Sequence, residues 1–174
     1  MPGIFLWAFD NPSLLRSPDP RMSLRPLCRF LVAWLFLCAA AAWARAQDGP
    51  QPRLPTIELT AGMHVIRAEV ARAPHEQMIG MMFRRTMGAN EGMLFANEHH
   101  ETRCFWMKNT LLPLSIAFIA DDGTVVNIAY MQPLDERSHC SVKPVRYALE
   151  VNQGWFAKRG ISAGFKLRGP PFGR

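Results

Sequence analysis

The sequence lacks the short motifs that mark common enzyme classes. It contains no Gly-x-Ser-x-Gly nucleophile elbow, no His-Glu-x-x-His zinc motif and no glycine-rich phosphate loop. No internal repeat or low-complexity tract is visible either. Catalytic triads are defined in space rather than by sequence, so an enzyme stays an alternative to a binding protein. We predict no cofactor and assign no catalytic residue.

Clusters of basic residues are also missing, although the formal net charge of the 174-residue chain is +6. Lysines and arginines are scattered between acidic residues, with no basic stripe and no interleaved aromatics. Nucleic-acid binding depends on clustered cations. We therefore predict no nucleic-acid partner.

The sequence also lacks an apolar run long enough for a membrane-spanning helix. Residues 30–44 supply about 15 apolar residues, where a spanning helix needs about 20. Arg25 and Arg29 precede this run, and Ala44-Arg45-Ala46 follows it with the small-x-small pattern that signal peptidase cuts. We predict a signal peptide over residues 22–46, cleavage after Ala46, and a periplasmic or secreted protein. Retention as a membrane anchor is the alternative.

Cleavage would divide the chain into unequal parts. Residues 1–46 form an N-terminal extension with the signal peptide, and translation starts at Met1 or, as we favour, at Met22. Removing them lowers the net charge to +3 and leaves 128 residues, enough for one modest core. A flexible tether is predicted over residues 47–56, which contain three prolines and a glycine, and a C-terminal tail over residues 169–174.

Few cysteines remain after the predicted cleavage. Cys28 and Cys38 leave with the leader, while Cys104 and Cys140 stay in an oxidising compartment, where two thiols usually pair. A disulfide between them closes a loop of about 37 residues and raises the free energy of unfolding by roughly 4 kcal/mol in the chain-entropy model. A metal site of thiols and two buried free thiols are the alternatives.

Residues 57–168 are predicted to form a single β-rich domain. The clearest signal is a hairpin of residues 114–120 and 124–130, joined by Asp121-Asp122-Gly123, because Asp-Gly supplies the positive φ angle of a tight turn. Period-two alternation and turn residues predict further strands and two short helical segments. The fold class is mainly β (α+β), a small antiparallel β-barrel or sandwich with one or two short helices. The other expected strands cover residues 57–59, 64–70, 92–95, 104–107, 146–152 and 165–167, and the helical segments cover residues 74–82 and 155–159.

Four short motifs, in order and spacing, resemble a known family. They are Gly80-Met81-Met82-Phe83-Arg84, Gly92-Met93-Leu94-Phe95, Phe105-Trp106-Met107-Lys108-Asn109-Thr110 and Ala148-Leu149-Glu150-Val151. Over about residues 60–168 the chain resembles the bacterial and archaeal family called domain of unknown function 192. The resemblance implies a compact, mainly β domain that is often exported and has no established activity. The family usually has an acid where this chain has Ser115, so a role of that acid does not transfer.

Five polar residues of the domain are candidates for a shared ligand-binding pocket. A carboxylate and a lysine in one site of low dielectric shift each other's pKa and can bind a substrate. Structural ion pairs or solvated faces are the alternative for the same residues. An envelope enzyme that uses these groups is a second alternative. The five candidates are Glu76, Arg84, Lys108, Asn109 and Glu150.

Copper binding is a further alternative, because thioether and imidazole ligands suit copper in an oxidising compartment. Eight of the ten methionines and all five histidines lie after the leader. However, Met78, Met81 and Met82 have the spacing of a buried helix face, and His99-His100 reads as an exposed loop. We therefore assign no metal ligand. The leading prediction is an exported β domain that binds a small ligand or an envelope protein, with membrane contact only if the leader is retained.

Overall fold

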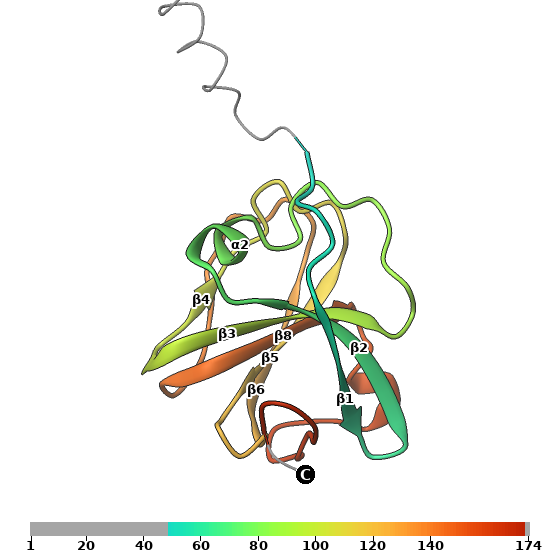
Figure 1. Cartoon of the computed structure of the whole chain (residues 1–174), viewed down its shortest axis with the longest axis vertical. Helices are drawn as coiled ribbons and strands as arrows, with labels where there is room; N and C mark the ends of the chain where they lie inside the picture. The colour runs from blue at the N-terminus through green and yellow to red at the C-terminus, as the bar shows by residue number, and fades with distance from the viewer. Residues whose placement is uncertain (1–48, 173–174) are drawn as a thin grey trace, which may run out of the picture. The chain divides into compact units, whose positions relative to one another are not determined.

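The computed structural model of the chain describes residues 49–172 (Figure 1). The predicted signal peptide, its cleavage after Ala46 and the choice between Met1 and Met22 lie outside the described residues. Within residues 49–172, no helix has the length and apolar character needed to cross a bilayer. The domain boundaries stay predictions.

A sheet of six strands forms the centre of the domain, in the spatial order β1-β2-β3-β8-β5-β6. Four of its five neighbouring pairs are antiparallel, and β2 and β3 are parallel. A separate sheet of two strands pairs β4 with β7. The strands are β1 Thr56–Ala61, β2 His64–Ala71, β3 Glu91–Glu101, β4 Cys104–Phe105, β5 Leu114–Ile119, β6 Val125–Met131, β7 His139–Cys140 and β8 Val145–Asn152.

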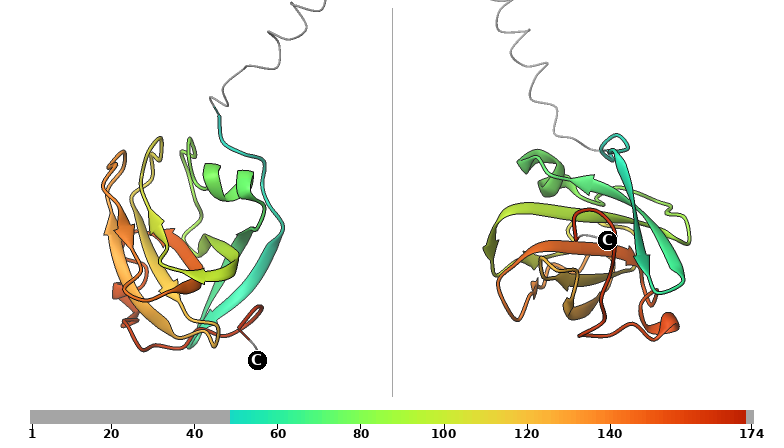
Figure 2. Two further views of the ribbon diagram at one scale, coloured as in Figure 1. Left: turned by 90° about the vertical axis from the view of Figure 1, so that its left-hand side faces the viewer. Right: turned by 60° about the horizontal axis from the view of Figure 1, so that its bottom comes forward.

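The mainly β prediction is confirmed, with two short helices, α2 Pro74–Ile79 and the 3-10 helix η1 Ala157–Arg159. The sheet is not closed into a barrel, because its edge strands β1 and β6 do not pair with each other. Residues after η1 instead run along one end of the sheet, as Figure 2 shows in red. They form isolated bridges, Thr60 with Arg168 and Thr124 with Lys166, so the strand predicted at residues 165–167 is reduced to bridging contacts.

The parallel pair of β2 and β3 departs from the expected antiparallel arrangement. Parallel neighbours need a crossover connection, and residues 72–90, which contain α2, supply it. Helix α2 begins at Pro74, where the missing amide costs nothing, and ends at Ile79 rather than near Met82. It ends there because Gly80 takes a non-helical conformation with φ of 50°. This crossover carries several side chains onto one face of the sheet.

The predicted hairpin of β5 and β6 is confirmed. Gly123 has φ of 86° in its turn, the conformation for which Asp-Gly was expected. A Cβ atom at this position would lie 2.2 Å from the carbonyl oxygen of Leu167. Glycine is therefore required both by the turn and by the close approach of the C-terminal segment.

The two faces of the sheet pack into two apolar clusters. The C-terminal cluster contains Trp155, Phe156, Leu167 and other side chains that follow β8. The helix-side cluster, on the other face, contains residues such as Met81, Met107 and Phe118. Because strand side chains alternate, β8 contributes to both clusters. Its residues Tyr147, Leu149 and Val151 belong to the first and Ala148 to the second. Val145, at the start of the strand, also belongs to the second cluster, although the alternation would place it with the first.

Two local features complete the domain. The Cys104–Cys140 disulfide is present, as predicted, and joins β4 to β7, a strand that the sequence did not indicate.

Part of the segment predicted to be a flexible tether, residues 47–56, contacts the domain. The buried Gln51 side chain donates hydrogen bonds to the carbonyl oxygens of Glu76 and Gly80, at 3.0 and 2.9 Å. The chain is thus anchored to the crossover from Gln51 onward.

Candidate functional site

Glu150 lies in the middle of the sheet, on strand β8, with its side chain on the face of the helix-side cluster. Its neighbours across the two adjacent strands are Met93 of β3 and Ile116 of β5, both fully buried. Only 4% of Glu150 is exposed. A carboxyl group thus lies between two fully buried apolar neighbours, at a position where an apolar side chain is usual.

A small hollow, which we call the inner hollow, lies over Glu150 and has a volume of about 40 Å³. Helix α2 and the turn after it form one wall, and the segment from β4 to Thr110 forms another. This volume holds one or a few atoms of the size of water. The lining residues are Gln77, Met78, Ile79, Gly80, Met81, Met82, Phe95, Phe105, Trp106, Thr110 and Glu150.

A larger outer hollow, of about 410 Å³, adjoins the inner one. The two share six lining residues, Gln77, Met78, Met82, Phe95, Phe105 and Trp106. The outer hollow adds Pro74, Asn97, Arg103 and Cys104. Helix α2 and strand β4 lie on the same side of β3 in Figure 1, and both border this space. Together the hollows form an apolar, aromatic pocket with a carboxyl group at its base.

Burial raises the pKa of Glu150 to about 8, from its ordinary value of 4.5. No charge or hydrogen bond from the described residues offsets this effect. Glu150 is also the only titratable residue that lines the inner hollow. At neutral pH the carboxyl group is therefore mostly protonated, and it can both donate and accept a hydrogen bond. A buried acid with a perturbed pKa in a cleft is a candidate functional group.

Arg84, another predicted ligand-binding residue, contacts a different acid. Its guanidinium donates two hydrogen bonds to the carboxylate of Glu69, with Nη2 at 2.7 Å from Oε2. Both side chains are buried. Burial alone would raise the pKa of Glu69, but hydrogen bonds from Arg84, the Leu54 amide and Arg53 lower it to about 2. Arg84 thus forms a buried ion pair, away from the residues that line the inner hollow.

The other three candidates are separate from Glu150 as well. Glu76 accepts hydrogen bonds from the amides of Arg72 and Ala73, at 2.8 and 2.9 Å, and so caps its own helix. These bonds lower its pKa. Lys108 is exposed, with Nζ 5.1 Å from the ring centre of Trp106. Asn109 is also exposed, and its carbonyl oxygen accepts a hydrogen bond from the Phe83 amide.

Of the five candidates, only Glu150 lines the inner or the outer hollow. A ligand-binding role for the whole set stays a prediction. The other residues that line the two hollows were not predicted from the sequence, and most of them are apolar. Methionine and aromatic side chains usually indicate a hydrophobic core, so the sequence gives little reason to assign them to a pocket. Gln77 is one of them, and its side-chain amide donates a 3.1 Å hydrogen bond to the carbonyl oxygen of Ala96 in β3. This bond links α2 to the sheet beside the pocket.

The histidines are not part of a three-ligand metal site with Cys, Asp or Glu side chains in the described part of the chain. No group of three or more His, Cys, Asp or Glu side chains that could hold a metal ion occurs among residues 49–172. Met81 is buried as expected, but Met78 is 71% exposed at the border of the pocket. His99 and His100 are exposed, as expected, but lie within β3 rather than in a loop.

One comparison with known proteins identifies a family, and another finds similar solved structures. The model of the family described as Uncharacterized ACR, also called DUF192, matches residues 57–169. A crystal structure from Sinorhizobium meliloti, described as that of a candidate transcription regulator, is 35% identical, with a TM-score of 0.64. It covers 68% of this chain and 97% of its own. A protein of unknown function from Novosphingobium aromaticivorans is 36% identical, with a TM-score of 0.62, over 72% of this chain and 94% of its own. Among curated proteins, none matches this chain.

Proposed function

This chain belongs to the domain of unknown function 192 family, and from that premise we propose that its domain binds a small, mainly apolar amine in the pocket above Glu150. One observation carries the proposal. A carboxyl group that is 4% exposed and has no charged or hydrogen-bonding neighbour among residues 49–172 lines an otherwise neutral inner hollow. A buried polar group without a partner is costly, so a ligand that provides one gains affinity.

The chemistry of the lining favours an amine over an acid. An alkyl ammonium group has a pKa near 10.4, above the value of about 8 for Glu150, so the proton passes from the carboxyl to the amine. The resulting ammonium and carboxylate pair in a site of low dielectric. Phe95, Phe105 and Trp106 also line the inner hollow, and aromatic rings make favourable contacts with a cation. A carboxylate placed beside Glu150 would instead meet an inner hollow without a cation, because Arg103 lines only the outer hollow.

The outer hollow takes the apolar body of the ligand. Its volume of about 410 Å³ falls within the range of roughly 300–1,000 Å³ that is usual for small-molecule sites. Met78 and Met82 supply flexible thioether walls that adapt to ligand shape. The hollow therefore accepts a ring or a short branched chain attached to the amine.

We also propose that the domain works outside the cytoplasm, in the periplasm or after secretion. The Cys104–Cys140 disulfide supports this location, because such bonds persist in oxidising compartments. N-terminal sequencing of protein recovered from the cell envelope tests the cleavage after Ala46. Full-length protein confined to the cytoplasm contradicts the proposal.

Three matched probes test the ligand class. 2-Phenylethylamine, 2-phenylethanol and phenylacetate share one ring and differ in the end group. We expect amide NMR signals of the residues around the pocket to shift most with the amine, less with the alcohol and not with the acid. The Glu150→Gln variant loses the preference for the amine, whereas Glu136→Gln, at an exposed position, keeps it. Equal binding of amine and acid, or no saturable shift near the pocket with any probe, contradicts the proposal.

A further inference from the structure

The Cys104–Cys140 disulfide lies at the surface of the domain. Both cysteines are exposed, and they face each other directly across β4 and β7. Besides this pair, the two-stranded sheet contains only the pair of Phe105 and His139. Exposed disulfides are the ones that exchange with thiols, whereas buried structural ones resist reduction. The position of this bond is therefore that of a reactive group.

The disulfide also borders the outer hollow from one side only. Cys104 lines that hollow together with its neighbours Arg103, Phe105 and Trp106, whereas Cys140 does not line it. A molecule held in the hollow therefore lies beside the first cysteine. Holding a reactant next to the reacting group raises its effective concentration.

We propose that this disulfide is a thiol-exchange site for small thiols that enter the outer hollow. The thiolate sulfur of the incoming molecule attacks Sγ of Cys104, a new disulfide forms there, and the Cys140 sulfur leaves as a thiolate. A second thiol then attacks the mixed disulfide, releases Cys104 as a thiolate and leaves the small molecule as its disulfide. Two thiols are oxidised by two electrons in total, the protein disulfide is reduced, and the two protons pass to the cysteine thiolates. The step requires no amine ligand.

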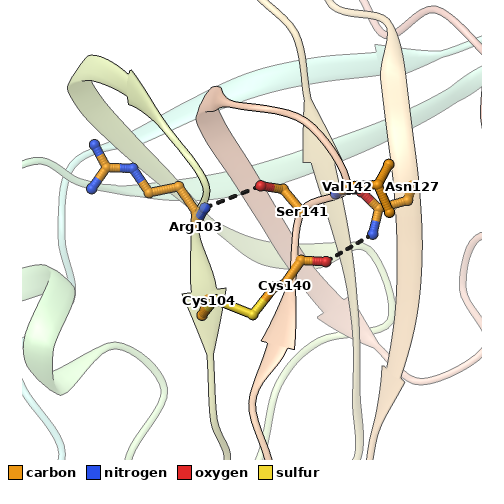
Figure 3. Close-up of a disulfide and its surroundings, with 6 residues drawn as sticks. All are labelled: Arg103, Cys104, Asn127, Cys140, Ser141 and Val142. Carbon is orange, nitrogen blue, oxygen red and sulfur yellow. Dashed lines mark hydrogen bonds between the residues drawn. A yellow bond between two sulfur atoms is a disulfide. The ribbon is translucent and has the colours of Figure 1, made fainter.

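Hydrogen bonds around the disulfide hold both segments in place when the bond opens (Figure 3). The Ser141 amide donates to the carbonyl oxygen of Arg103 at 2.9 Å, and the Arg103 amide donates to Oγ of Ser141 at 3.0 Å. On the other side, Nδ2 of Asn127 donates to the carbonyl oxygen of Cys140 at 3.1 Å. The Val142 amide donates to Oδ1 of Asn127, also at 3.1 Å. Exchange thus proceeds in the folded domain, and the two cysteines stay close enough to pair again.

Arg103 adds a charge that favours the attacking species. Its guanidinium lines the outer hollow and pairs with Glu101 at 3.3 Å, while that acid is largely exposed. A cation in the lining of the hollow attracts anionic thiolates, and salt weakens the attraction. The site is therefore expected to favour anionic thiols such as glutathione over neutral ones.

Reduction kinetics of the native disulfide test the proposal. The full chain, with Cys28→Ser and Cys38→Ser so that only this pair reacts, is mixed with increasing dithiothreitol and quenched with acid. Direct attack on the folded protein gives a rate that rises linearly with thiol concentration. A plateau at the rate of global unfolding, measured separately in urea, overturns the proposal.

Two comparisons locate the attack. With oxidised glutathione, the Cys140→Ser variant, which keeps Cys104, forms the mixed disulfide about tenfold faster than the Cys104→Ser variant. The reason is that Cys104 lines the outer hollow and Cys140 does not. Arg103→Gln slows reduction by glutathione at low salt but not by mercaptoethanol, whereas Arg85→Gln, at another surface, changes neither rate. Equal reactivity of the two single cysteines, or equal effects of the two arginine substitutions, contradicts exchange at the hollow.

Discussion

Replacement of Glu150 by glutamine provides the sharpest test of the buried carboxyl group. The pKa of Glu150 is raised to about 8 in the folded protein, against an ordinary value of 4.5 in the unfolded chain. Below pH 4.5 both states hold the proton. Between pH 4.5 and 8 the unfolded state has lost it and the folded state still binds it. The free energy of unfolding therefore falls as the pH rises through this window.

The expected change is large for a small domain. A shift of one pKa unit corresponds to about 1.4 kcal/mol, so this residue alone removes about 3–4 kcal/mol of stability between pH 5 and pH 8. Glutamine keeps the shape of the side chain and carries no titratable proton. Glu150→Gln is therefore close to the wild type in stability at pH 5 and more stable by about 3–4 kcal/mol at pH 8.

Urea unfolding at half-unit steps from pH 5 to pH 8 measures this difference directly. The comparison uses the wild type, Glu150→Gln and the exposed control Glu136→Gln, with the disulfide intact in all three. Contributions from other titrating groups cancel in the difference between variants. Parallel pH profiles for the wild type and Glu150→Gln would refute the assignment of Glu150 as a buried, neutral acid.

Three further substitutions test the packing around the sheet, with urea unfolding as the assay. Arg84→Met leaves the Glu69 carboxylate buried without its bidentate partner and costs about 3–5 kcal/mol, so a loss below 1 kcal/mol contradicts a buried ion pair. Gly123→Ala costs roughly 2–4 kcal/mol, because its Cβ clashes with Leu167 and φ is positive, and an unchanged midpoint contradicts that contact. Phe118→Ala, in the helix-side cluster, costs about 3–5 kcal/mol, and full tolerance argues against its complete burial.

Local features of the fold could be predicted from the sequence. The hairpin around Gly123 follows from two alternating runs and an Asp-Gly turn, which are all determined by neighbouring residues. The Cys104–Cys140 pairing followed from compartment and cysteine number rather than from geometry. In contrast, the parallel pairing of β2 with β3 depends on where the crossover places the chain, and no local pattern encodes that.

The candidate site could be predicted only in part, because most of its residues come together only through long-range packing. Glu150 was one of the five polar candidates, but the alternation of Val145, Tyr147, Leu149 and Val151 places it on the polar face of the strand, so its burial was not predictable from that pattern. The partner of Arg84 was not predictable either, since Glu69 lies on another strand and only the folded arrangement brings the two together. Phe105 and Trp106 look like ordinary core residues in the sequence. Their place in the pocket wall depends on the short pairing of β4 with β7.

Strand β8, whose side chains alternate between the two apolar clusters, also limits how the family can vary in length. Inserting or deleting one residue would reverse the facing of every side chain beyond that point. Glu150 would then turn toward the aromatic C-terminal cluster, and a neighbouring apolar residue would fill the base of the inner hollow. Natural insertions and deletions are therefore expected in the connections on either side of β8, and the number of residues between Val145 and Asn152 should be constant among relatives that keep the pocket.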